Sequence, residues 1–362
     1  MRDLKLYSRI FLLTDEQVAM CCLPVVLSKV ACELHLPQMA DAPTLVLPAG
    51  EQHKNLASVQ QIWDFLFAHQ ATRSDLLVNI GGGVICDMGG FAASTYMRGM
   101  AYANIPTTLL AMVDAATGGK TGIDYTPSPH SPSSSLSPFT LKNAIGVFAE
   151  PVATIIRPEL LSTLPSEQLL SGWAEMLKHA LLQGREPFAE LIDFDMQQIT
   201  SPAFGELIRQ SIAFKQSVTQ QDPHDKGLRQ ILNLGHTVGH AIEALLIERS
   251  QQSNIPHPTS PKPHGYCVMY GLVAEAYLSH AICGLPAEVV CALSRMMCQY
   301  YGAAPISCKD FDPLVQHMLH DKKNTQQGCI TCTLLADIGR PLTAQAVTIA
   351  QLREALEYLC SL

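Results

Sequence analysis

Long apolar runs are missing from this sequence, and their absence excludes one large class of proteins. No stretch reaches the roughly 18 consecutive apolar residues that a membrane-spanning helix requires. The N-terminus also lacks the basic and then apolar pattern of a secretory signal peptide. We therefore expect a cytoplasmic protein without a membrane partner.

Charge is scarce as well. Charged residues make up 15% of the chain and hydrophobic residues 48%, a balance typical of compact globular proteins rather than disordered ones. The net charge is −8, and no stripe of basic side chains is present that could follow a phosphate backbone. The composition therefore argues against nucleic acid as a partner.

The cysteines do not form the pattern of a disulfide-rich protein. The 12 cysteines are scattered through apolar segments of a long chain, which is typical of free buried thiols. Cys329 and Cys332 form a single CxxC motif within the alternating run GCITCTLL. Because alternation predicts a strand, we favour a structural interpretation of this motif over a redox or zinc site.

The order of apolar patterns predicts two domains of different class. At 362 residues the chain is long enough for two ordinary domains. Residues 1–158 alternate aliphatic and helical segments, which predicts an α/β domain with a parallel sheet, and residues 159–362 are mainly α-helical in pattern. The predicted strands are residues 10–13, 44–47 and 76–80, and the predicted helices are residues 58–69, 166–182, 204–220, 231–243, 266–280 and 287–301.

A glycine-rich turn follows the third predicted strand. Gly81, Gly82 and Gly83 precede a predicted helix, and Asp87 lies within that helix. Glycines at this place let backbone N–H groups approach a pyrophosphate closely. A plain tight turn is the alternative. The spacing is not GxGxxG, so an ordinary Rossmann domain is not implied.

A second loop carries hydroxyl, carboxylate and ammonium groups. Thr107, Thr108, Asp114 and Lys120 lie in one short span, as expected for a loop that binds an anion or a ribose. The letters GGKT superficially resemble a P-loop. However, the first glycine of GxxxxGK[ST] would fall at Asp114, so we reject a P-loop nucleoside triphosphatase.

The most informative stretch is residues 231–243, which read ILNLGHTVGHAIE. Apolar residues at helical spacing predict that His236 and His240 project from one helix face. Since neutral imidazole is the commonest zinc ligand, that face could hold a metal; two hydrogen-bonded helix histidines are the alternative. Glu175 and His264 offer further donors from two other apolar runs.

Residues 125–140 read YTPSPHSPSSSLSPFT and contain little that could be buried. This composition predicts a disordered insertion. The insertion separates Lys120 from Lys142, and we favour a spacer over a lid for its role.

Eight motifs together resemble those of the 3-dehydroquinate synthase family, a group of sugar-phosphate cyclases. In chain order they are GEQHKN, GGGVICDMGGFAASTYMRG, IPTTLLAMVDAATGGKTGID, LKNAIGVF, GWAEMLKHALL, GLRQILNLGHTVGHAIE, HGYCVMYGL and DKK. The resemblance implies an α/β NAD-binding domain joined to a helical metal-binding domain, in a homodimer.

The reaction that this resemblance implies converts 3-deoxy-arabino-heptulosonate 7-phosphate into 3-dehydroquinate and phosphate, a step of the shikimate pathway to aromatic amino acids. NAD transiently oxidises the sugar phosphate, phosphate is eliminated, the hydride is returned, and an aldol step closes the ring. The enzyme is then a carbon–oxygen lyase with no net redox change.

The resemblance also assigns residues to each part of the site. The ligands of a zinc or cobalt ion are Glu175, His236 and His264, so His240 is reassigned from the metal to the substrate. The NAD-binding residues are Glu51, Lys54, Gly81, Gly82, Gly83, Asp87, Thr107, Thr108, Asp114, Lys120 and Lys142. The substrate-binding residues are Lys120, Lys142, Asn143, Lys178, Lys215, Arg229, Asn233, His240 and Lys322 or Lys323, with Arg98 supplied across the dimer.

The chain departs from the family pattern at several positions. Ala115 and Ala116 replace the usual serines near the cofactor, and Tyr266 replaces a glutamate. The second change predicts that a carboxylate supporting His264 is missing. Three alternatives are another sugar-phosphate cyclase, a metal-dependent alcohol dehydrogenase of related fold, and an NAD-binding protein without turnover. The lysines that would bind a phosphate favour the 3-dehydroquinate synthase assignment over the alcohol dehydrogenase.

Overall fold

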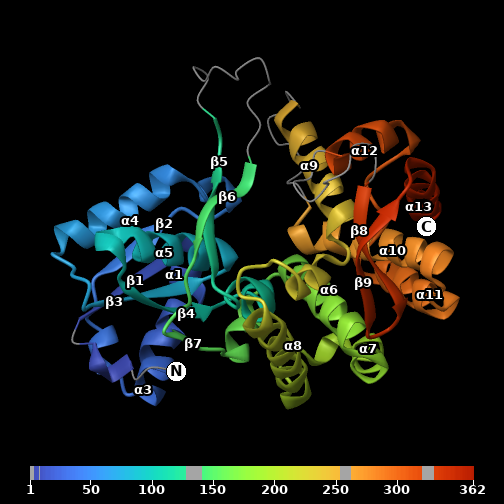
Figure 1. Ribbon diagram of the computed structural model, residues 1–362. Helices are drawn as coiled ribbons and strands as arrows, with labels where there is room; N and C mark the ends of the chain where they lie inside the picture. Colours follow the sequence, from blue (N-terminus) through green and yellow to red (C-terminus); the bar gives the residue numbers. More distant parts are fainter. Residues whose placement is uncertain (1–3, 8, 128–140, 253–261, 320–329) are drawn as a thin grey trace. The chain divides into compact units, whose positions relative to one another are not determined.

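The computed structural model describes residues 4–7, 9–127, 141–252, 262–319 and 330–362 (Figure 1). The chain divides into two compact units, Met1–Pro165 with Ile199–Gly205 and Ser166–Gln198 with Glu206–Leu362. The boundary predicted between residues 158 and 159 falls at the start of the 3₁₀ helix η7 (Pro158–Thr163). No helix in the described part of the chain is long and apolar enough to cross a membrane.

A parallel five-stranded sheet forms the core of the first unit. Its strands, in spatial order, are β2 (Thr44–Leu47), β1 (Ile10–Asp15), β3 (Leu76–Gly81), β4 (Ala101–Pro106) and β7 (Ala153–Thr154), and every neighbouring pair is parallel. Strand β3 is buried at every residue, as expected for a central strand covered on both faces. The predicted α/β domain with a parallel sheet is confirmed.

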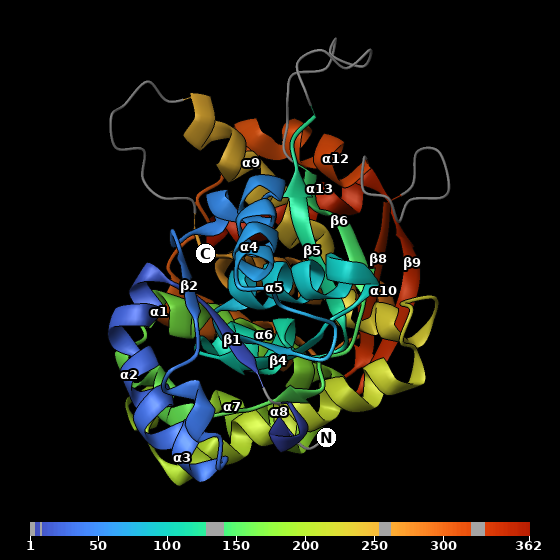
Figure 2. The same ribbon diagram turned by 90° about the vertical axis from the view of Figure 1, so that its left-hand side faces the viewer.

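Two helices position the loop that follows β3. Helix α5 (Gly83–Thr95) starts directly after that strand and packs against β3 and β4 (Figures 1 and 2). Helix α4 (Leu56–Ala68) packs against α5, and its first turn is capped by the Asn55 side chain, which accepts a hydrogen bond from the Ser58 N–H. Buried apolar side chains from α4, α5 and the sheet form one core cluster.

An antiparallel hairpin of β5 (Lys120–Tyr125) and β6 (Leu141–Phe148) completes the first unit. Tyr125 pairs with Leu141, so the first residue of the predicted insertion belongs to β5. Residues 128–140 of that insertion lie outside the described residues. The remaining elements of this unit are η1 (Leu4–Leu6), α1 (Glu16–Cys21), α2 (Leu23–Val25), η2 (Val26–Val30), α3 (Ala31–Glu33), η3 (Pro37–Met39), η4 (Glu51–His53), η5 (Tyr96–Arg98) and η6 (Ala111–Ala115).

The second unit is mainly helical, as predicted. Its helices are α6 (Ser166–Gln183), α7 (Arg185–Ile192), η8 (Met196–Gln198), α8 (Pro202–Gln221), η9 (Leu228–Asn233), α9 (His236–Gln252), α10 (His264–Cys283), α11 (Ala287–Met296), η10 (Met297–Tyr301), η11 (Cys308–Asp310), α12 (Phe311–Leu319) and α13 (Ile349–Ser361), and the first four residues of α8 belong to the first unit. The strands β8 (Ile330–Asp337) and β9 (Arg340–Val347) form a hairpin, which confirms the strand predicted around Cys332. Cys329 lies outside the described residues.

Helix α10 is the centre of the second unit. It is buried on all sides along most of its length and packs against α6, α9, α13 and β8 (Figure 1). A helix that is apolar all round belongs in such a place. The starts of α9 and α10, and the middle of α6, are thereby fixed by one packed core.

The helix predicted over residues 231–243 is interrupted. The chain forms η9 as far as Asn233, and α9 begins only at His236. Gly235 lies between them with a φ of 78°, a left-handed conformation that glycine adopts without strain. The prediction of one continuous helix was wrong because the buried carboxylate of Glu275 accepts a hydrogen bond from the Gly235 N–H at the break.

Glycines allow α9 and α10 to approach each other closely. A Cβ on Gly239 would lie 2.8 Å from the carbonyl oxygen of Cys267. A Cβ on Gly271 would collide with the carbonyl oxygen of Gly235. The absence of these side chains lets the two backbones pack in direct contact. The histidines at the starts of the two helices are thus brought together.

Candidate functional sites

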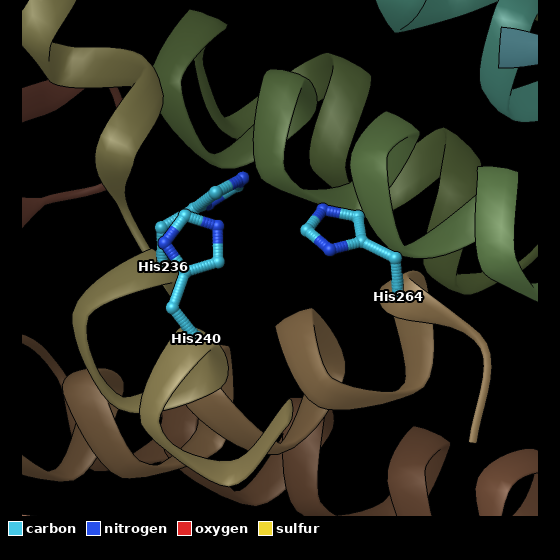
Figure 3. A group of neighbouring side chains, drawn as sticks. All are labelled: His236, His240 and His264. Carbon is cyan, nitrogen blue, oxygen red and sulfur yellow. The ribbon is translucent and has the colours of Figure 1, made fainter. Parts of the chain in front are cut away.

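Three histidines converge in the second unit. His236 is the first residue of α9, His240 follows one turn later, and His264 is the first residue of α10. Figure 3 shows their imidazole rings facing a common space, and one ligating atom from each lies within 4.8 Å of the other two. The geometry therefore brings His264 next to two histidines that lie more than 20 residues before it in the sequence.

Glu175 joins this group from α6. Its side chain is fully buried, and its Oε1 lies 3.4 Å from His236 Nε2 and 3.5 Å from His264 Nε2. Two atoms that each lie 2.0–2.1 Å from a tetrahedral zinc ion are about 3.4 Å apart. Both distances match that edge, so Glu175 Oε1 is placed to share one tetrahedral ion with each of the two histidines.

The second oxygen of Glu175 serves a different partner. Oε2 forms a buried ion pair with the Nζ of Lys178, one turn later in α6. Burial alone would raise the pKa of Glu175, but Lys178 and His236 outweigh burial and hold this pKa well below its usual range. Burial and Lys178 lower the pKa of His236. Glu175 is therefore a carboxylate and His236 a neutral imidazole, the forms that metal binding requires.

His264 also has a carboxylate on its other side. Its Nδ1 lies 3.3 Å from Glu243 Oε2. Burial alone would lower the pKa of His264, but Glu243 and Glu175 outweigh burial and raise this pKa to about 10. The expectation that His264 lacks a supporting carboxylate is therefore wrong. Glu243 of α9 supplies one, and Tyr266 instead packs its ring against Tyr301 at 4.9 Å between centroids.

His240 is exposed at the surface of the second unit, with its ring centroid 5.1 Å from that of His236 and 5.7 Å from that of His264. His240 is close enough to the other two histidines to be a further metal ligand, and it is accessible enough to bind the substrate. Its assignment to the substrate stays a prediction.

The starts of α9 and α10 are held by side chains that the sequence analysis missed. Glu275, buried in α10, accepts the Gly235 N–H at 2.6 Å and the Val238 N–H at 3.1 Å. The Gly265 N–H of α10 donates to Ser171 Oγ of α6 at 3.0 Å. One signal was visible, since Glu275 is an acidic residue inside the apolar run GLVAEAYL. Such a residue needs buried partners.

Several of the residues predicted to hold the substrate lie on elements of the second unit. Lys215 of α8 and Arg229 of η9 are buried, and Arg229 donates from Nη1 to the Pro223 carbonyl at 3.1 Å. Asn233 ends η9 and is half-buried. Lys322 and Lys323 lie outside the described residues.

The glycine-rich loop in the first unit has little room for side chains. A Cβ on Gly81 would lie 2.6 Å from Ile85, and one on Gly82 would lie 3.1 Å from Thr108. The Thr107 N–H donates to the Gly81 carbonyl at 2.9 Å, while the buried Thr107 Oγ1 has no hydrogen-bond partner within the described ranges. Thr108 Oγ1 accepts the Ala111 N–H at 3.1 Å, so it also caps the turn that carries Asp114.

Lys54 connects several of the predicted cofactor residues. Its Nζ donates to Asp87 Oδ2 and to Asn143 Oδ1, both at 2.6 Å, and Lys142 lies 3.8 Å from Glu51. Burial opposes the charge of Lys54, but Asp87 and Glu51 outweigh it and raise the pKa of this ammonium group. The predicted NAD-binding residues Glu51, Lys54 and Asp87 thus adjoin Asn143, which was predicted to bind the substrate.

A small pocket lies next to this network. It is lined by Cys86, Asp87, Ala115, Gly119, Lys120 and Pro151. Ala115 is one of the two departures from the family pattern near the cofactor, and a Cβ on Gly83 would lie 3.2 Å from its Cβ. The structure therefore places Ala115 beside the glycine-rich loop.

Arg98 is exposed on a strained turn of the first unit. Met97 and Arg98 have φ values of 49° and 65°, and Gly99 follows with 124°. Left-handed conformations at two successive non-glycine residues cost energy and are concentrated at functional sites. The assignment of Arg98 to a neighbouring subunit stays a prediction.

The fold of this chain, with a parallel-sheet unit and a mainly helical unit, is shared with two solved enzyme structures. The structure of 2-epi-5-epi-valiolone synthase from Streptomyces hygroscopicus, with NAD+ and Zn2+ bound, matches with a TM-score of 0.77 at 24% identity, covering 98% of this chain and 92% of that one. The structure of 2-deoxy-scyllo-inosose synthase with NAD+, Co2+ and carbaglucose-6-phosphate matches with a TM-score of 0.75 at 23% identity, covering 98% and 92%.

At the level of sequence, the chain belongs to the 3-dehydroquinate synthase family. The family models match residues 44–171 for the N-terminal part and residues 172–324 for the C-terminal part. The 3-dehydroquinate synthase of Parabacteroides distasonis is 39% identical over 97% of this chain and 91% of its own length.

Proposed function

We propose that this chain converts 3-deoxy-arabino-heptulosonate 7-phosphate into 3-dehydroquinate and phosphate, with NAD and one divalent metal ion as cofactors. The family supports the reaction, and the two solved cyclases named above support the cofactors. The observation that carries the proposal is the position of Glu175 Oε1, at tetrahedral-edge distance from the Nε2 atoms of both His236 and His264.

The donor set of this centre suits zinc or cobalt, and its residues have distinct tasks. When bound, the ion would polarise substrate hydroxyls, and the nicotinamide would take up and return a hydride. Lys178 holds Oε2 of Glu175, which leaves Oε1 for the ion. His236 presents a neutral Nε2, and the exposed His240 imidazole can exchange a proton with a substrate hydroxyl.

The anionic ends of the substrate require cations, although the chain as a whole carries a charge of −8. We assign this task to a cationic and polar set from the second unit. Its members are Lys178, Lys215, Arg229, Asn233 and Lys322, together with Lys120, Lys142 and Asn143 from the first unit. Lysine and arginine bind phosphate and carboxylate groups through charge-assisted hydrogen bonds.

We place NAD at the loop that follows β3 in the first unit. Backbone N–H groups at Gly81, Gly82 and Gly83 would bind the pyrophosphate, and the buried Thr107 hydroxyl adjoins this loop. The remaining groups of this proposed site are Glu51, Lys54, Asp87, Thr108, Asp114, Lys120 and Lys142. We further propose a homodimer in which Arg98 completes the site of the neighbouring subunit; its exposed, strained turn supports this.

The experiment that tests the function is phosphate release from the heptulosonate phosphate by the purified protein. We expect phosphate and 3-dehydroquinate to form in equal amounts, activity to be lost with a chelator, and activity to return with Zn2+ or Co2+. His236→Ala should release no phosphate. Turnover of sugar phosphates without this heptulosonate specificity would point to another cyclase, and undiminished turnover in chelator would remove the metal from the mechanism.

A further inference from the structure

His264 lies between two carboxylates that approach different ring nitrogens. Its Nε2 is 3.5 Å from Glu175 Oε1, on the side of the proposed ion, and its Nδ1 is 3.3 Å from Glu243 Oε2. Glu243 is buried, with 8% of its side chain exposed. The position of the ring is therefore fixed from both sides.

The chemistry of imidazole gives this arrangement a direction. In a neutral imidazole one nitrogen carries the hydrogen and the other carries the lone pair that binds a metal. An ionised carboxylate only accepts hydrogen bonds, so Glu243 holds the hydrogen on Nδ1. When the ring loses its second proton to bind an ion, the lone pair of His264 is left on Nε2, which faces Glu175.

The other histidine ligand is oriented in the same sense by a different acceptor. His236 Nδ1 lies 3.1 Å from the carbonyl oxygen of Leu234, and its Nε2 also faces Glu175. A backbone carbonyl cannot be removed by mutation, whereas Glu243 can. Of these two ligands, His264 therefore offers a direct test of whether orientation matters.

We propose that Glu243 is a positioning residue of the metal centre, which selects the tautomer of His264 and holds its Nε2 toward the ion. The proposal rests on the metal centre of the proposed function. Glu243 follows His236 in α9 by about two turns, so one helix supplies a ligand and orients the ligand that begins α10. Because Glu243 orients His264, the glutamate that Tyr266 replaces is not needed to do so.

The test compares Co2+ affinity among variants of the metal-free protein, measured by equilibrium dialysis and by the visible absorption of bound Co2+. We expect Glu243→Ala to lower the affinity by roughly 10–100-fold, as is typical for the hydrogen-bonding partners of ligands. Glu243→Gln should lose less, because its amide oxygen can still accept from Nδ1–H. Its Co2+ spectrum should shift, since a neutral acceptor makes the imidazole a weaker donor.

The chain offers a matched control on the same helix. Glu248 lies 3.4 Å from His317 Nε2, a similar acid–histidine pair that is separate from the proposed ligands. Glu248→Gln should leave the Co2+ affinity and spectrum unchanged.

Three results would count against these proposals in different ways. Wild-type affinity in Glu243→Ala, or a lower melting temperature with unchanged Co2+ affinity in Glu243→Gln, would overturn the positioning role alone. The Gln variant decides the question if the Ala variant does not fold. A wild-type protein that binds no Co2+ would overturn the metal centre and the positioning role with it.

Discussion

At the residue scale, Glu175 is the side chain on which the proposed metal centre depends, because its two oxygens have different partners. One faces two histidines and the other is paired with Lys178. The side chain of Glu175 is fully buried, and that of Lys178 is only 2% exposed. Removing either charge would therefore leave its partner buried and uncompensated.

We predict that Lys178→Met destabilises the metal-free protein by about 3–5 kcal/mol, the usual cost of leaving one member of a buried ion pair alone. Added Zn2+ or Co2+ should recover part of this loss, since a cation compensates the same carboxylate. Thermal melting with and without metal measures both effects. An unchanged melting temperature without metal would show that Lys178 does not neutralise Glu175.

The sequence predicted these central residues but not their supports. The family motifs identified Glu175, His236 and His264, and the structure brings Glu175 Oε1 to 3.4 and 3.5 Å from the Nε2 atoms of the two histidines. Glu243 and Glu275 were missed because their roles depend on contacts between helices. Spacing within one helix does not reveal such contacts, and a glutamate in an apolar run shows only that some buried partner exists.

At the scale of elements, the packing of α9 against α10 places the histidines. We predict that Gly271→Ala lowers the free energy of unfolding by at least about 1–3 kcal/mol, because its Cβ would collide with the backbone of Gly235. Metal affinity should fall as well, since the two helix starts would be forced apart. Urea denaturation and Co2+ titration measure these effects.

A matched control for this prediction is available in α8. Nothing lies within 4 Å of a Cβ built on Gly205. Gly205→Ala should therefore stabilise the protein by about 0.5–1 kcal/mol, the helix propensity difference between the two residues. Equal effects of the two substitutions would refute the close-packing argument.

The helices and strands that were predicted lie near their expected positions, except for the helix over residues 231–243. The apolar spacing of residues 231–243 continues through the break at Gly235, so periodicity alone predicts one helix. The break depends on a hydrogen bond from Gly235 to Glu275, 40 residues later. Local pattern cannot contain that information.

At the scale of the whole molecule, the two units are expected to respond to different ligands. The proposed metal ligands all belong to the second unit and the glycine-rich loop to the first. A ligand at 100 times its dissociation constant stabilises the state it binds by about 2.7 kcal/mol. We predict that Zn2+ slows hydrogen exchange mainly in the second unit and that NAD slows it mainly in the first.

Hydrogen exchange followed by mass spectrometry would resolve these responses by residue range. Protection by NAD confined to α9 and α10 would contradict the proposed cofactor site. Protection by Zn2+ confined to β3 and α5 would contradict the metal centre.

The class of each unit followed from the sequence, whereas the order of strands did not. Alternating helix and strand patterns predict parallel strands in general. They do not show that β1 lies between β2 and β3 in the sheet, or that β8 pairs with β9 in the helical unit. Those arrangements depend on which apolar faces pack together, and many orders are compatible with the same pattern.

The hydrogen bonds from Gly235 and Val238 to Glu275 also have an electrostatic consequence. The aligned peptide dipoles of a helix give its first turn about half a positive charge, which repels a cation bound at that end. His236 is the first residue of α9, so a metal ion there would face this repulsion, and the carboxylate of Glu275 offsets it from within the core. Glu275→Gln should therefore weaken Co2+ binding even under conditions in which the variant is fully folded. Dialysis against Co2+ well below the melting temperature would measure how much of the affinity of this site for a cation comes from a residue that does not touch the metal.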